Sequence, residues 1–204
     1  MNPTTEGEVL KAIHRLKNGK AAGIDHIQPE LLKYSSAAVP ALTRLCNVMW
    51  ETKTVLADWQ NGVVIPVPKT WDLSDCNNWC GITLSAPGKV FSSILLGRLR
   101  EVLDSQMRQE QADFRQGRSC NDQIFTLRQI LEKVTAWKKP VIMNSVDFRK
   151  AFDCIHQPSL WKSLKSGIPD NIIAIIQNMY DDSQNAVKWL GTIGQWFLVI
   201  TGVG

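Results

Sequence analysis

The stretch Val141-Ile142-Met143-Asn144-Ser145-Val146, followed by Asp147, decides the expected fold of this chain. It is a short, mostly apolar run that begins after Pro140, and it predicts a buried strand with Asp147 at its end. Burying a carboxylate is costly unless a partner neutralises the charge, and a divalent cation does so. Mg²⁺ prefers oxygen ligands, so Asp147 is a candidate metal ligand. The alternative is an aspartate that caps the following turn.

Two helices and a hairpin are expected after this strand. Pro158 and Pro169 each stand where a helix can begin, and Gly167 separates the two helices. Two aromatic runs, residues 186–190 and 196–200, are joined through glycines and predict a β-hairpin. The chain therefore alternates strands and helices around Asp147.

Further elements are expected before the strand. Thr5 and Glu8 fit a capping box that opens a helix. Residues 63–68 form a β-branched run with two prolines, which predicts an edge strand, and residues 81–84 can pair back on it as a hairpin. Three more helices are predicted by apolar residues at helical spacing: residues 42–50, 87–99 and 124–134.

The composition sets only broad limits. The chain has 204 residues, 44% of them hydrophobic, and a net charge of +4, which permits a polyanionic partner without requiring one. The five cysteines are odd in number and scattered, which predicts free thiols in a reducing compartment. Cys76 and Cys80 have no second pair at zinc spacing. With no apolar run near membrane-spanning length and no leader, an intracellular protein, nuclear or cytoplasmic, is expected.

Seven blocks of the sequence, in order and at close to the expected spacing, resemble the reverse transcriptase domain of non-LTR (LINE-type) retrotransposons. The strongest is Val146-Asp147-Phe148-Arg149-Lys150-Ala151-Phe152-Asp153. The resemblance implies an RNA-directed DNA polymerase, a magnesium-dependent nucleotidyltransferase that uses an RNA template, a DNA primer and deoxynucleotide triphosphates. The other blocks are residues 16–25, 66–69 with 75–84, 87–91, 110–120, 167–169 and 196–203.

The resemblance implies roles for the residues around Asp147. Polymerisation is phosphoryl transfer through two metal ions about 3.5–4 Å apart. Asp147 matches the first catalytic aspartate, which holds both ions, and the backbone carbonyl of Phe148 is the second ligand. Phe152 matches the position whose bulk excludes a ribose 2′-hydroxyl. A core residue is the alternative for Phe152, and one ring can serve both purposes.

Three basic residues match nucleotide-binding positions. Lys69 matches the lysine that contacts the triphosphate, although a solvated residue at a strand end is its simpler explanation. Arg115 and Arg118 fall in a block that the family places near template or nucleotide, and a guanidinium suits phosphate. Most surface arginines bind nothing.

The resemblance also implies the architecture, an α+β right-hand polymerase fold. Residues 1–139 correspond to a helical fingers region with a β-hairpin. Residues 140–204 correspond to an incomplete palm sheet, with the first catalytic strand, helices and a hairpin. An incomplete palm predicts an exposed sheet edge and poor solubility.

The sequence departs from the family pattern in three places. Cys80 replaces an arginine that clamps phosphates, and a thiol cannot replace a bidentate cation. Asp113 replaces a glycine before a phenylalanine. The block with the paired catalytic aspartates is not among these 204 residues, and Tyr180-Asp181-Asp182-Ser183, which resembles that pair, is expected at a helix end or turn.

These departures predict that the chain alone has no polymerase activity, since one carboxylate cannot hold two Mg²⁺ ions against their hydration. A non-catalytic RNA- or DNA-binding remnant of a transposable element is the alternative. A third possibility is an unrelated metal-dependent hydrolase that uses Asp147 and Asp153. That would need further ligands at motif spacing, which the three histidines do not provide.

Overall fold

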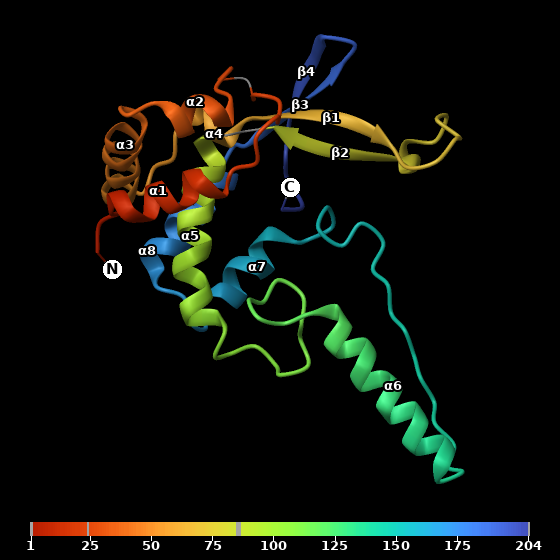
Figure 1. Cartoon of the computed structure of the whole chain (residues 1–204). Coiled ribbons are helices and arrows are strands. Elements are labelled where there is room, and N and C mark those ends of the chain that lie inside the picture. The colour runs from red at the N-terminus through yellow and green to blue at the C-terminus, as the bar shows by residue number, and fades with distance from the viewer. Residues whose placement is uncertain (1, 24, 85–86, 204) are drawn as a thin grey trace.

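The computed structural model describes residues 2–23, 25–84 and 87–203 (Figure 1). In these residues, eight α-helices and a short 3₁₀-helix accompany one four-stranded sheet, as the α+β prediction requires. The helices are α1 (Glu6–Arg15), α2 (Pro29–Tyr34), α3 (Ala38–Thr52), α4 (Ala57–Gln60), η1 (Cys76–Asn78), α5 (Pro87–Leu103), α6 (Cys120–Ala136), α7 (Gln157–Leu164) and α8 (Asp170–Tyr180); the strands are β1 (Gly62–Pro68), β2 (Trp79–Leu84), β3 (Gln184–Trp189) and β4 (Thr192–Leu198).

The first helix confirms the predicted capping box. The Thr5 hydroxyl accepts from the backbone N–H of Glu8, and the Glu8 carboxylate accepts from the backbone N–H of Thr5. These bonds satisfy N–H groups that have no partner within the helix. The buried face of α1, which includes Val9 and Ile13, packs on α3 and α5.

Glu8 also joins the N-terminal segment to α5. Its two carboxylate oxygens each accept from the guanidinium of Arg98 at 2.9 Å. The same guanidinium donates to the carbonyls of Asn2 and Pro3 and lies 4.6 Å from the centre of the Trp50 ring on α3. The bonds from Arg98 lower the pKa of Glu8 to about 2. Arg98 therefore holds three segments together and is not a solvated surface arginine.

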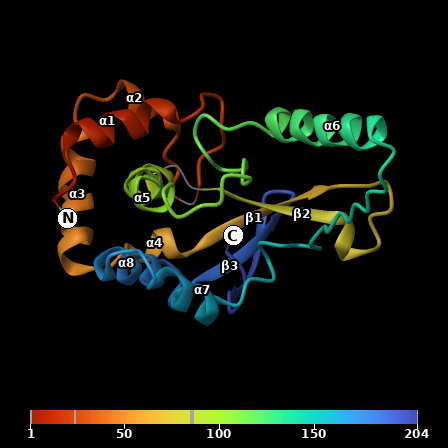
Figure 2. The ribbon, with the colours of Figure 1, turned by 90° about the horizontal axis from the view of Figure 1, so that it is seen from below.

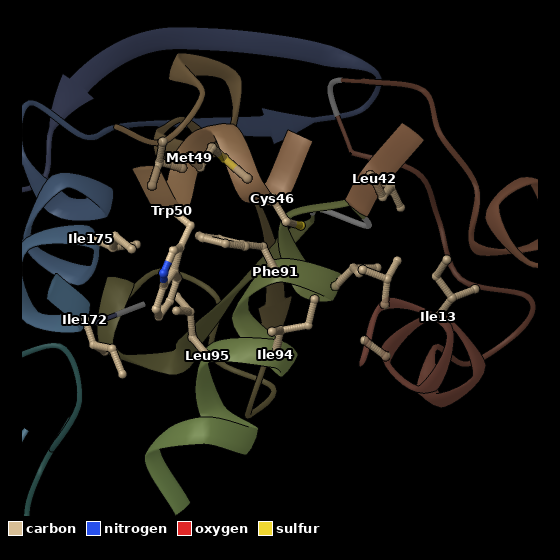
Figure 3. Packing of buried hydrophobic residues seen from close by; sticks show 14 of the residues in the cluster. Ile13, Leu42, Cys46, Met49, Trp50, Phe91, Ile94, Leu95, Ile172 and Ile175 are labelled. Atoms are coloured by element: carbon tan, nitrogen blue, oxygen red, sulfur yellow. The ribbon is translucent and has the colours of Figure 1, made fainter. Parts of the chain in front are cut away.

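The main core lies where α5 crosses α1, α3 and α8 (Figures 1 and 3). Phe91 of α5 is fully buried, and its ring lies 6.1 Å from that of Trp59. α8 is tied to the segment after α3, because the Asn178 side chain accepts from the N–H of Val55 and its carbonyl accepts from the Gln60 amide. The buried members of the core are Val9, Ala12, Ile13, Leu32, Leu42, Cys46, Met49, Trp50, Val55, Val90, Phe91, Ile94, Leu95, Ile168, Ile172, Ile173 and Ile175.

The sheet has the strand order β2-β1-β3-β4 (Figure 1), and Figure 2 shows β1, β2 and β3 from below. β1 pairs antiparallel with β2, and β3 with β4, so both predicted hairpins are confirmed. β1 also pairs parallel with β3, which joins the hairpins into one sheet. The sheet therefore combines strands from both sides of residue 139.

The edge-strand prediction for residues 63–68 is half right. β1 lies between two strands, but its pairing with β3 covers only Gly62 to Val64. Pro66 and Pro68 lie beyond that pairing, where one side of β1 is open. Proline has no N–H to donate, so an open side is where a strand tolerates it.

The predicted buried strand at residues 141–146 is wrong. These residues form neither strand nor helix, and the segment runs extended between α6 and α7. Ile142 and Val146 are 89% and 78% exposed. Apolar, β-branched residues favour a strand only where another strand pairs with them and another layer covers them. No described residue of this chain supplies either.

The remaining predictions of local structure are confirmed. The helices expected at residues 42–50, 87–99 and 124–134, and those begun at Pro158 and Pro169, all form. All five cysteines carry free thiols. None of the described helices combines the length and the apolar character that crossing a membrane requires.

Candidate functional site

Asp147 lies in the exposed segment between α6 and α7, not at the end of a strand. The Phe148 side chain is 75% exposed as well. In the described part of the chain, no group of three or more Asp, Glu, His or Cys side chains is placed to hold a metal ion. Mg²⁺ gives up water reluctantly and needs several oxygen ligands. One exposed carboxylate and a neighbouring carbonyl do not form a magnesium site by themselves.

Residues 149–154 form a turn that carries Phe152. The backbone N–H of Cys154 donates to the Lys150 carbonyl at 3.1 Å, and Lys150 has a left-handed φ of +50°. Phe152 makes an edge-to-face contact with Phe114, with 6.2 Å between ring centres and 89° between planes. The loop before α6 therefore meets the turn after Asp147. Both rings are more than half exposed.

Residues 201–203, which we call the C-terminal strap, close on the same turn. The N–H of Val203 donates to the Phe152 carbonyl at 3.0 Å, and that of Gly202 donates to the Ile155 carbonyl at 2.9 Å. The Gln157 amide donates to the Gly202 carbonyl. A Cβ on Gly202 would lie 2.9–3.1 Å from the backbone of Asp153, and φ at Gly202 is +85°. Only glycine fits this position without strain.

Three stretches that are distant in sequence therefore meet at Phe152. They are the loop with Phe114, the turn after Asp147 and the C-terminal strap. Sequence reasoning selected all three stretches as blocks but did not predict the contact between the two phenylalanines or the need for glycine at 202. Nothing in the spacing of these residues reveals either feature, because both are tertiary.

Lys69 lies where the β1–β2 hairpin begins its loop. Its backbone N–H donates to the Asn78 carbonyl at 2.7 Å, and its side chain is exposed. The loop is ordered by its own side chains: Asp75 caps η1, and the Trp79 ring donates to the Leu73 carbonyl. Lys69 is thus held at a defined place on a projecting hairpin (Figure 1).

Arg115 has a structural task that its sequence did not reveal. Its side chain is only 8% exposed. The guanidinium donates to the Asp104 carboxylate at 2.9 Å and to the carbonyls of Arg108 and Gln111, and it lowers the pKa of Asp104. Arg115 therefore stabilises the loop after α5, because its bonds join distant parts of that same loop. Arg118, in contrast, is exposed and donates only a 3.3 Å bond to Gln109 among the described residues.

The Tyr180–Ser183 stretch is a helix end, as predicted. Tyr180 is the last residue of α8, Asp181 caps the helix and Asp182 occupies a turn. The Tyr180 ring packs against Trp161, and burial raises the pKa of its hydroxyl. These aspartates are therefore not the acid pair of a hairpin.

Comparison with known proteins identifies the family of the chain. Residues 67–202 match the family described as "Reverse transcriptase (RNA-dependent DNA polymerase)". The matched span includes the loop of Phe114, the turn of Phe152 and Gly202 of the strap.

Two relatives come from transposable elements. The chain is 30% identical to the "Putative 115 kDa protein in type-1 retrotransposable element R1DM" of Drosophila melanogaster, over 80% of this chain and 16% of that protein. It is 23% identical to the "Transposon TX1 uncharacterized 149 kDa protein" of Xenopus laevis, over 91% of this chain and 14% of that protein. The chain thus spans only 14–16% of the length of these relatives. The chain belongs to the reverse transcriptase family, in the branch of non-LTR, LINE-type elements.

Proposed function

We propose that this chain is the fingers and the first part of the palm of an RNA-directed DNA polymerase, which other polypeptide segments must complete for catalysis. The observation that carries the proposal is the meeting of three family blocks at Phe152. A polymerase active site needs the nucleotide-selecting ring, its supporting loop and the following strap in one place. The contact of Phe114 with Phe152 and the bonds of the strap support the proposal, because they bring these three stretches together.

The division of the chain follows the family pattern. Residues 1–139 form the fingers, with the β1–β2 hairpin as their projecting part, and residues 140–204 form the partial palm. The parallel pairing of β1 with β3 links the two parts. This pairing covers Gly62 to Val64 only, so Lys69 lies on the part of the hairpin that extends beyond β3.

The site residues keep distinct tasks in this proposal. Lys69 and Arg118 contact the phosphates of the nucleotide or template with exposed cationic groups. Arg115 acts near the same ligand by holding the loop in shape, since its guanidinium is already bonded within the loop. Phe152 excludes a 2′-hydroxyl by its volume. Asp147 and the Phe148 carbonyl contribute part of a divalent-metal site.

Metal binding limits what the chain does alone. A divalent metal supplies charge stabilisation in phosphoryl transfer. The donor set on the described residues does not fit a complete metal site, so no catalytic step is assigned to this chain by itself. Binding of RNA or DNA without chemistry is the second candidate function, and the incomplete donor set favours it for the isolated chain.

A chimera tests the proposal directly. Residues 67–202 replace the matching segment of an active relative, with Cys80→Arg and Asp113→Gly restoring the family pattern. We expect template-dependent extension by the chimera and its loss to background on Asp147→Asn, with Asp153→Asn as the matched control that retains activity. An active chimera that tolerates Asp147→Asn would contradict the role of Asp147.

The nucleotide filter has its own measurement in the same chimera. Phe152→Ala is expected to raise the incorporation of ribonucleotides relative to deoxynucleotides, because it removes the ring that a 2′-hydroxyl would strike. Phe125→Ala, on a helix surface outside the site, leaves that ratio unchanged. Equal ratios of ribonucleotide to deoxynucleotide incorporation in the two variants would show that Phe152 does not exclude the 2′-hydroxyl.

Isolated binding is measured by gel shift. Binding of the chain to labelled RNA through several phosphates must weaken steeply between 50 and 200 mM salt, by about 10³-fold or more for six contacts. Salt-independent binding would exclude the binding function.

A further inference from the structure

A hollow of about 560 Å³ lies between α1 and α5. Its α1 wall carries Lys11 and Arg15, and its α5 wall carries Ser93 and Gly97. The N-terminal segment, residues 2–3, also lines it. None of the residues assigned to the polymerase site lies in this lining. We call this hollow the α1–α5 groove and treat it as separate from that site.

The groove is open because α5 presents small side chains to it. Ser93 and Gly97 lie four residues apart, on one face of the helix. A Cβ on Gly97 would meet no atom within 4 Å, so close packing does not require glycine there. Its backbone is helical, so a left-handed φ does not require glycine either. Glycine inside a helix lowers stability relative to alanine, so the open space indicates a task other than packing.

Two cations of the groove have no partner in the described part of the chain. Arg98 lines the groove as well, but its charge is compensated, since both carboxylate oxygens of Glu8 accept from it. Lys11 and Arg15 take part in no ion pair among the described residues. They lie four residues apart, which places them on one face of α1 and about 6 Å apart along its axis. The Ser93 hydroxyl on the opposite wall adds an uncharged donor.

These donors define the chemistry of the ligand. Ammonium, guanidinium and hydroxyl groups all donate, so the ligand must present negatively charged oxygen atoms. A guanidinium binds two oxygens of a phosphate at once, and an ammonium binds phosphate as a point charge. In both views α1 and the far end of the β1–β2 hairpin lie at opposite ends of the molecule, so this phosphate is not that of a nucleotide beside Lys69 (Figures 1 and 2). In a chain of the RNA-dependent DNA polymerase family, a backbone phosphate of the nucleic acid meets these requirements.

We propose that the α1–α5 groove binds a backbone phosphate of a single RNA strand outside the polymerase site. Lys11 and Arg15 supply the charge, Ser93 supplies a third donor, and Gly97 leaves room for the ligand. The inference rests on the proposed function, which supplies the nucleic acid, but it does not depend on Asp147 or on a metal ion. It gives α1 a task in holding the strand at a distance from the nucleotide.

A gel shift of the full chain with labelled single-stranded RNA across a salt series tests the charges. The double variant Lys11→Gln/Arg15→Gln should raise the dissociation constant at least about tenfold and lower the salt slope by about 0.7 for each lost contact. The matched control is Arg44→Gln/Lys53→Gln, which removes two exposed charges on α3 and at its end. It should leave the salt slope unchanged. Equal effects of the two double variants would overturn the proposal.

Filling the hollow tests the location without a change of charge. Gly97→Leu places a side chain in the open space and should weaken RNA binding at least about tenfold, whereas the thermal melting temperature should not fall, because leucine favours a helix. Ser92→Leu is the matched control, since Ser92 is an exposed neighbour on α5 that does not line the groove. It should leave the affinity unchanged. Unchanged affinity in Gly97→Leu would overturn the location of the site.

The outcomes separate this proposal from the proposed function. RNA binding by the wild type that Lys11→Gln/Arg15→Gln retains would overturn the groove alone and leave the binding function standing. Failure of the wild type to bind RNA would overturn both. Displacement of the RNA by a poly-glutamate peptide at an equal concentration of negative charge would show a general anion surface and contradict a phosphate site.

Discussion

The helical core and the segment from α6 to Asp147 are built from similar residues with opposite results. In the core, Phe91 and Ile172 are fully buried, whereas Phe125 of α6 and Ile142 after it are mostly exposed. Both regions carry capped or proline-started helices and apolar runs of normal pattern. The difference is the extent of packing: α5 has α1, α3 and α8 around it, while no residue of α6 is buried. An apolar pattern therefore does not predict what covers an element, and at residues 141–146 it did not predict the element itself.

The largest expected effect is on the free energy of unfolding, when one phenylalanine in each region is truncated to alanine. Phe91→Ala should lower the free energy of unfolding by about 3–5 kcal/mol, since it removes a buried ring and leaves a cavity. Phe125→Ala should change it by no more than about 0.5 kcal/mol, because that ring is exposed. Urea unfolding followed by tryptophan fluorescence measures both. Similar losses would mean that the two regions do not differ in packing.

The next effect contrasts two arginine ion pairs. Arg98→Ala should cost about 2–3 kcal/mol, because it removes a bidentate pair, two bonds to carbonyls and the contact with Trp50. Arg128→Ala on α6 removes an exposed pair with Glu132 and should cost about 0.3–0.5 kcal/mol. The same unfolding experiment ranks them. An equal cost would show that Arg98 is not a structural anchor.

Two glycines with a left-handed φ differ in their surroundings: one lies in the C-terminal strap and the other in the exposed loop before α6. Gly202→Ala should cost about 1–3 kcal/mol through strain and contact with the Asp153 backbone. Gly117→Ala meets open space and should cost about 1 kcal/mol through φ alone. Hydrogen exchange at the Val203 amide, which donates to Phe152, should accelerate only in Gly202→Ala. An unchanged exchange rate at the Val203 amide in Gly202→Ala would contradict the role of Gly202 in holding the strap on the turn.

The pH dependence gives the smallest effect. The folded pKa of Glu8 is about 2, below its ordinary value of 4.5, so its contribution to stability is present above pH 4.5 and is lost as pH falls toward 2. Glu8→Gln should flatten this part of the stability curve. The curve of Glu132→Gln, on exposed α6, should follow the wild type. A wild-type slope in Glu8→Gln would assign the acid sensitivity to other groups.

The sequence predicted most elements because their determinants are local. The capping box at Thr5, the helix-starting prolines and the two hairpins each depend on residues close in the chain. The strand at residues 141–146 failed because a strand is defined by its neighbours, and a run of six residues contains no information about them. The prolines of β1 correctly predicted a strand with one unpaired side. The pairing of Gly62 to Val64 with β3 was not predicted, because it depends on a strand about 120 residues away in the chain.

The candidate site was predictable only in part. Asp147, Phe152 and Lys69 were selected by resemblance to a family. The acceptor of Arg115 is Asp104, eleven residues earlier, and the ring beside Phe152 belongs to Phe114, 38 residues earlier. Such contacts depend on the path of the chain in space. The resemblance could therefore propose residues for the site, but it could not give the contacts that those residues make.

We propose that Asp147 is one carboxylate of a polymerase site whose other metal ligands are not among the described residues. The most direct test is primer extension by the purified chain on an RNA template, with Mg²⁺ or Mn²⁺ and deoxynucleotide triphosphates. We expect no extension above a control without protein. Template-dependent extension that Asp147→Asn abolishes would contradict it, since one polypeptide would then hold a working set of metal ligands.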